Sequence, residues 1–143
     1  MSADTQNLPP AWQAAGWRPR ELPGFIGLCG PLWTRKDGDT WLYGLLPDAG
    51  HLNPAGVVHG GALLTLMDHA MSAVAWEACE RQACVTLDLS TQFLAAVRAG
   101  QGVEARAEVV RRTRQLVFMS GQLTVDGEPV LRGQAILKIV AGR

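Results

Sequence analysis

The 143-residue chain lacks a surplus of charge, is poor in cysteine, and has no long uninterrupted apolar run. Its 13 Lys and Arg residues balance 13 Asp and Glu residues, whereas nucleic-acid binding needs an excess of positive charge on one face. No apolar stretch approaches the roughly 20 residues that cross a bilayer, and no apolar signal core occurs near Met1. The three cysteines form no CxxC pair, so we expect free thiols and a cytoplasmic protein.

What is present is the composition of one folded domain. Hydrophobic residues make up 48% of the chain and charged residues 18%, which is typical of a globular protein with a continuous core. Residues 1–24 carry four prolines and two tryptophans. We therefore predict an irregular N-terminal arm, with one helical turn, that docks through its tryptophans. Residues 25–143 are predicted to form the domain itself.

The order of predicted elements indicates an α+β fold. Residues 32–46 read as two strands around the turn Asp37-Gly38, and residues 62–80 read as one long apolar helix. Four strands follow, at residues 84–94, 103–109, 116–125 and 130–140, the last two joined by Asp126-Gly127. This order predicts the hotdog architecture, a mostly antiparallel five- to six-stranded sheet wrapped around one long central helix.

The strand at residues 84–94 carries a simple alternation. Its apolar face is predicted to comprise Val85, Leu87, Leu89, Thr91 and Phe93, and its polar face Thr86, Asp88, Ser90 and Gln92.

Two features at the helix suggest chemistry. Gly60 and Gly61 lie at its start, where backbone N–H groups lack intrahelical acceptors and glycine admits a close ligand. Asp68 falls at the edge of the apolar face, where a carboxylate is costly without partners. About 12 Å of helix separates Gly60 from Asp68. We expect an acyl group along the helix to contact both, with the amide holding its oxygen and the carboxylate attacking the carbonyl or deprotonating water.

The motif around these residues carries a family resemblance. His51, Asn53, Gly56, His59, Gly60 and Gly61, followed by Asp68, keep the register of an H-x-N-x-x-G-x-x-H-G-G run with a later Asp. In this the chain resembles the PaaI-like hotdog thioesterases of phenylacetate degradation, over residues 44–140.

The resemblance implies hydrolysis of an acyl-CoA, with Asp68 as nucleophile or general base and the Gly60 amide as the oxyanion contact. It further implies that Asn53 orients the attacking group and that Thr86, from a neighbouring subunit, positions the water. His59 would lie beside the site in a structural or hydrogen-bonding role.

The resemblance also implies partners and substrate contacts. We expect a homodimer with shared active sites, and a homotetramer built from two such dimers, without nucleic-acid or membrane partners. No cofactor is expected apart from the coenzyme A that forms part of the substrate. Gly61, Arg112 and Arg114 are candidate coenzyme A contacts, although the glycine that many members carry before this basic turn is absent here.

Three other interpretations remain to be weighed. An enoyl-thioester hydratase would need Asp68 and His69 to act on one atom, but adjacent helical residues point about 100° apart. A non-catalytic acyl-CoA sensor would not need the carboxylate. A metal site built from His51, His59, His69 and Asp68 matches no common zinc spacing. The acyl group stays open, because Met67, Met71, Met119 and Phe93 suit either a pocket or the core.

Overall fold

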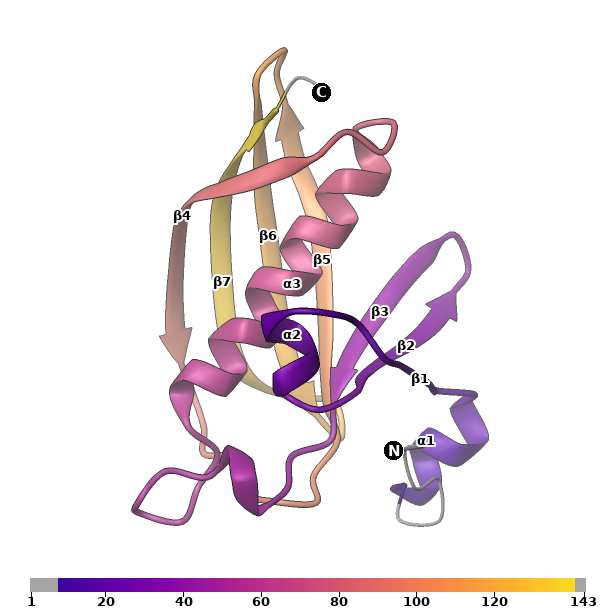
Figure 1. Cartoon of the computed structure of the whole chain (residues 1–143), viewed down its shortest axis with the longest axis vertical. Helices are drawn as coiled ribbons and strands as arrows, with labels where there is room; N and C mark the ends of the chain where they lie inside the picture. The colour runs from indigo at the N-terminus through magenta and orange to yellow at the C-terminus, as the bar shows by residue number, and fades with distance from the viewer. Residues whose placement is uncertain (1–7, 141–143) are drawn as a thin grey trace.

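The computed structural model describes residues 8–140 (Figure 1). The helices are α1 (Pro10–Ala15), α2 (Phe25–Leu28) and α3 (Gly60–Ala78), and a 3-10 turn, η2, spans Ala49–His51. The strands are β1 (Arg18–Arg20), β2 (Leu32–Asp37), β3 (Thr40–Leu45), β4 (Cys84–Phe93), β5 (Val103–Arg112), β6 (Leu116–Val125) and β7 (Glu128–Ile139). Every strand of the predicted domain is therefore present.

The strands form one seven-stranded sheet in the order β1-β2-β3-β5-β6-β7-β4, with antiparallel neighbours. This sheet curves around α3, which confirms the predicted hotdog fold (Figure 1). The strand count exceeds the prediction because the N-terminal arm adds β1. β4 follows α3 in the chain but pairs with β7, so it lies at one edge of the sheet.

The central helix buries one face against the sheet. Met67, Ala70, Met71 and Ala75 are fully buried against the sheet. The helix begins two residues earlier than predicted because the side chain of His59 caps it. It ends before Glu80 and Arg81, whose positive φ angles of 52° and 61° turn the chain back towards β4.

The N-terminal arm builds a second small core on the sheet face opposite α3. The rings of Trp12 and Trp17 stack with centroids 4.4 Å apart, and both are only 5% exposed. Trp12 lies directly over Gly44 and Gly102, where any side chain would collide with its indole. The prediction that the arm docks through its tryptophans is thus confirmed for residues 8–24, while residues 1–7 lie outside the described range.

Within residues 8–140, no helix is both long and apolar enough to span a membrane.

Candidate active site

Asp68 and Thr86 form the polar pair at the centre of the candidate site. Asp68 lies half-buried in the third turn of α3, next to the fully buried Met67. Thr86 Oγ1, on β4, donates a hydrogen bond of 2.7 Å to Asp68 Oδ1. The carboxylate is therefore held in a fixed orientation by a hydroxyl that retains lone pairs for a second partner.

A β-bulge makes this contact possible and corrects the predicted alternation of β4. The register against β7 shifts between Thr86 and Asp88, so β4 holds one extra residue there. Before the bulge Thr86 faces α3, and after it Leu89 packs on the same core. The prediction that placed Thr86 on the outer polar face, with Val85 and Leu87 inside, is wrong: Val85 is 47% exposed and Leu87 57% exposed.

The structure also corrects the expected origin of Thr86. The resemblance led us to expect this residue from a neighbouring subunit, whereas it reaches Asp68 within the same chain. The physical reason is that β4 returns beside α3 after a short turn at residues 79–83. Asp68 and Thr86 are therefore in hydrogen-bond contact within a single chain.

The two glycine amides at the start of α3 differ in their availability. The Gly61 N–H donates to His59 Nδ1 at 2.8 Å, which caps the helix and gives His59 the structural role predicted for it. The Gly61 amide is therefore engaged in the helix cap, and the contact of Gly61 with coenzyme A stays a prediction. Among the described residues, the Gly60 N–H has no hydrogen-bond acceptor. Gly60 alone presents a free donor at the positive end of the helix dipole.

Phe93 restricts the approach to Gly60, a contact that the sequence analysis missed. Its ring lies 3.2 Å from the position that a Cβ on Gly60 would occupy. Because this contact joins β4 to the helix start across a long stretch of chain, no local pattern signals it.

Asn53 is partly committed to its own loop. Its Oδ1 accepts hydrogen bonds from the amides of Ala55, at 3.0 Å, and Val57, at 3.2 Å. Only the Asn53 NH2 group remains for a ligand, and it can donate but not accept. Asn53 can thus orient a water molecule or a carbonyl group by donating a hydrogen bond to its oxygen atom.

The remaining histidines face away from this pair. His51 Nδ1 accepts from the Asp48 amide at 3.0 Å, and its Nε2 donates to the Cys29 carbonyl. His69 packs edge-on against Tyr43 of β3, with ring centroids 5.7 Å apart. Burial lowers the pKa of His69, an effect opposed by the charge of Asp68. This placement disfavours joint action of His69 and Asp68 on one atom.

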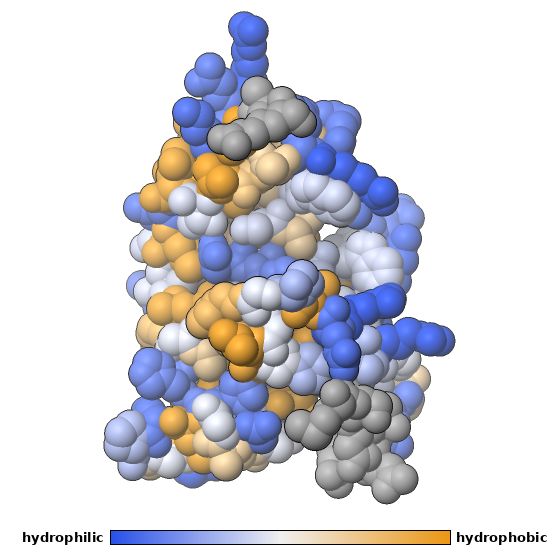
Figure 2. Space-filling view, viewed as in Figure 1, coloured by the Kyte–Doolittle hydropathy of each residue, from blue (hydrophilic) through white to orange (hydrophobic). Residues whose placement is uncertain are grey.

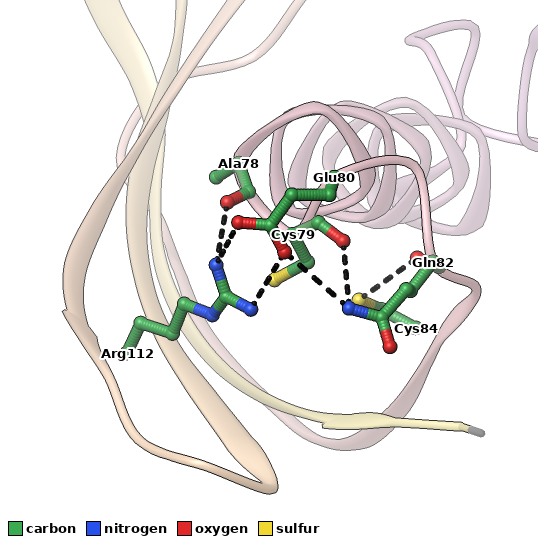
Figure 3. Close-up of polar contacts among 6 residues, drawn as sticks. All are labelled: Ala78, Cys79, Glu80, Gln82, Cys84 and Arg112. Carbon is green, nitrogen blue, oxygen red and sulfur yellow. Dashed lines mark hydrogen bonds and ion pairs between the residues drawn. The ribbon is translucent and has the colours of Figure 1, made fainter.

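Arg112 caps the C-terminal end of α3 (Figure 3). Its guanidinium donates to the Ala78 carbonyl at 3.0 Å and to both carboxylate oxygens of Glu80, at 3.0 and 2.9 Å. This ion pair lowers the pKa of Glu80. The guanidinium thus caps the helix, and the contact of Arg112 with coenzyme A stays a prediction. Arg114, exposed in the β5–β6 turn, has no such bond among the described residues.

Two further observations concern possible metal ligands and the methionines. No group of three or more His, Cys, Asp and Glu side chains is placed to hold a metal ion within residues 8–140. Met67, Met71 and Met119 are 0%, 0% and 1% exposed, so they belong to the core and cannot line an open acyl pocket.

Comparison with known proteins assigns the family. A model of the thioesterase superfamily matches residues 55–131, slightly more than half of the chain. The chain therefore belongs to the thioesterase superfamily, and it is a thioester hydrolase.

Individual relatives agree with this assignment. A Pseudomonas aeruginosa protein named as an esterase is 32% identical over 100 residues, covering 68% of this chain and 75% of that protein. Human acyl-coenzyme A thioesterase 13 is 32% identical over 87 residues, covering 59% of this chain and 61% of the human enzyme. A Bacillus halodurans protein crystallised with CoA has the same fold, with a TM-score of 0.77 at 23% identity, over 93% of this chain and 86% of that one.

Proposed function

We propose that this chain hydrolyses acyl-CoA thioesters, with Asp68 as the general base and the Gly60 amide as the donor to the thioester oxygen. The observation that carries the proposal is the 2.7 Å bond from Thr86 to a half-buried carboxylate on a mostly apolar helix. Such a carboxylate is costly to bury. Among residues 8–140, no basic side chain pairs with it as in a purely structural ion pair. The similarity to human acyl-coenzyme A thioesterase 13 and the CoA in the Bacillus halodurans structure support the substrate class.

The distance along α3 requires two copies of the chain for each site. Gly60 and Asp68 are eight residues apart in one regular helix, which is about 12 Å. A carbonyl carbon and its oxygen are bonded to each other, so one thioester cannot meet both groups of the same chain. We therefore replace the expectation that one acyl group lying along a single helix contacts both Gly60 and Asp68. We propose that Asp68 and Thr86 of one copy act with Gly60 and Asn53 of a second copy.

The surface of β4 supports such a pairing. This edge strand leaves one row of backbone N–H and C=O groups without a neighbouring strand, and its side chains Val85 and Leu87 are exposed and apolar. Exposed apolar edges of this kind pair with another strand. A homodimer joined along β4, with two such dimers forming a tetramer, is the assembly that we propose.

The proposed reaction needs no cofactor beyond the coenzyme A of the substrate. Asp68 takes a proton from a water held by Thr86 while the water oxygen attacks the thioester carbon. The Gly60 N–H of the second copy holds the negative oxygen of the tetrahedral intermediate. Cleavage of the C–S bond then releases the acid, and the coenzyme A thiolate takes the proton from Asp68.

Arg114 is the proposed contact for the coenzyme A phosphates. It lies in the β5–β6 turn beside the C-terminal end of α3, because its neighbour Arg112 bonds to Ala78. Ala78 is ten residues from Asp68 in α3, or about 15 Å. In acyl-CoA, the extended pantetheine arm likewise separates the thioester from the phosphates. The free thiols of Cys29, Cys79 and Cys84 support a cytoplasmic location for this enzyme.

A thiol-release assay with straight-chain and aromatic CoA esters tests the activity. We expect the wild type to release CoA and Asp68→Asn to lose at least about 100-fold in kcat, as loss of a general base does. Asp88→Asn, which replaces an exposed carboxylate on β4, is the matched control. Binding of CoA esters without cleavage would favour the sensor, and addition of water to an enoyl-CoA would favour the hydratase.

Mixing two inactive variants tests the shared site. If Asp68→Asn and Gly60→Pro chains exchange into mixed dimers, one intact site forms in each mixed dimer, and roughly a quarter of the wild-type activity returns. Absence of any recovery, with exchange verified by mass-tagged chains, would place both groups in one chain and overturn the shared site.

A further inference from the structure

The short helix α2 presents an apolar face that the fold does not use. Ile26 and Cys29, one turn apart, lie half-buried against the region between α2 and α3. Phe25 and Leu28 occupy the opposite face and are 68% and 85% exposed. Since Ile26 and Cys29 already anchor the helix, the packing of this chain gives no reason for two further large apolar side chains (Figure 2, orange surface over α2).

These two side chains border a cavity at the start of α3. The cavity has a volume of about 480 Å³, within the range of ligand pockets. Phe25, Leu28, Leu52 and Ala62 supply apolar lining, while polar lining comes from Asp48, His51, Thr65 and the residues His59 and Gly61 at the start of α3. Gly60, whose amide is free, immediately precedes Gly61 in the chain.

His51 holds the wall of this cavity in place. Its Nδ1 accepts from the Asp48 amide at 3.0 Å, so its Nε2 must carry the hydrogen that it donates to the Cys29 carbonyl at the end of α2. This bond ties α2 to η2 and the loop before α3. His51 belongs to the motif noted in the sequence but has no catalytic partner, and this bond gives it a positioning role.

We propose that the cavity between α2 and α3 binds the acyl chain of the substrate, with Phe25 and Leu28 determining preference for medium-length apolar acyl groups. This inference rests on the proposed acyl-CoA hydrolysis. A thioester whose oxygen meets the Gly60 amide has its acyl chain directed from a polar helix terminus into an apolar wall, which matches the polarity of the ligand. The core is closed to it because its methionines are fully buried.

The other exposed apolar surface is better explained by a second copy of the chain. Val85 and Leu87 lie along a free strand edge, where unpaired backbone groups favour a strand partner. Phe25 and Leu28 belong to a helix, whose backbone makes no such demand. The two surfaces are therefore assigned to different occupants.

Chain-length profiles of variants test the assignment. We expect Phe25→Ser and Leu28→Ser each to lower kcat/KM for octanoyl-CoA by about tenfold, because the substitution removes apolar contact with several methylene groups. Hydrolysis of acetyl-CoA should stay at the wild-type level. Val110→Ser, which replaces an apolar side chain 65% exposed on β5, is the matched control and should change neither substrate.

Three results would overturn the assignment, and each differs from failure of the proposed function. One is an equal loss of kcat/KM for acetyl-CoA and octanoyl-CoA in Phe25→Ser and Leu28→Ser. Another is no loss of kcat/KM for either substrate. The third is dissociation of the assembly in sedimentation experiments with Phe25→Ser or Leu28→Ser, which would make this face an interface between copies. Failure of the proposed function itself would appear as wild-type protein that releases CoA from no ester.

His51→Gln offers a separate measurement. It should weaken the tie between η2 and α2, raising KM for octanoyl-CoA while leaving kcat and the acetyl-CoA reaction unchanged. A change in kcat alone would contradict a positioning role for His51 at the acyl cavity.

Discussion

The Thr86 hydroxyl donates to the Asp68 carboxylate at 2.7 Å within one chain. This bond joins the edge strand to the central helix and orients the carboxylate. A hydrogen bond to a charged group is about twice as strong as one between neutral groups, so we expect it to matter both for the fold and for the reaction.

Substitutions at Thr86 should separate these two effects. Thr86→Ser keeps the hydroxyl and should retain most activity. Thr86→Val keeps the shape, removes the donor, and should lower kcat by roughly tenfold to a hundredfold. Steady-state kinetics check this, and the Asp68→Asn background is the control: there Thr86→Val should cost little more, because the pair acts as a unit.

Gly60 offers a direct test of the amide donor. Pro is well tolerated as the first residue of a helix, and His59, with φ −60° and ψ 135°, has the conformation required before Pro. Gly60→Pro therefore removes the free N–H while leaving the helix intact. We expect a loss of about 100-fold to 1,000-fold in kcat, the usual cost of one oxyanion donor.

The matched variant for that test is Gly60→Ala. It places the same Cβ against the Phe93 ring but keeps the N–H. A steric effect alone would make the two variants equally slow, which would rule out the amide as the oxyanion donor.

We expect the half-buried His69 to make stability depend on pH. Burial lowers the pKa of His69 below its ordinary value of 6.5, against the smaller effect of the Asp68 charge. Below pH 6.5 the unfolded chain binds a proton at His69 that the folded chain does not, so stability falls as the pH drops through this value. The decline ends once the pH passes below the folded-state pKa.

Urea unfolding at several pH values between about 8 and 5 measures this slope. His69→Gln should flatten it. His59→Asn keeps a good helix cap and retains His69, so it should keep the wild-type slope. A flattened slope in that variant would show that His59, and not His69, causes the pH dependence.

The docking of the arm depends on the absence of a side chain at Gly102. Gly102→Ala places a methyl group into the indole of Trp12, and such overpacking costs about 1–3 kcal/mol. We expect a lower free energy of unfolding and a red shift of tryptophan fluorescence. In the Trp12→Ala background, Gly102→Ala should cost nothing further; an equal cost there would show that Trp12 is not its point of contact.

Periodicity and turn residues were sufficient to predict most of the fold. The apolar helix, the Asp37-Gly38 and Asp126-Gly127 hairpins and the four later strands depend on neighbours in the chain, so the local pattern carries them. The motif around Gly60 and Asp68 named the candidate residues, but the helical spacing between them did not reveal that one thioester cannot meet both groups of the same chain.

The tertiary structure alone decided which groups meet. A one-residue bulge reversed the facing of Thr86, and simple alternation cannot reveal an extra residue in a strand. Long-range packing likewise placed Phe93 over Gly60, set Arg112 on the end of α3, and left Phe25 and Leu28 beside an open cavity. These contacts join segments distant in the chain, so their energies depend on the folded arrangement and not on the order of residues.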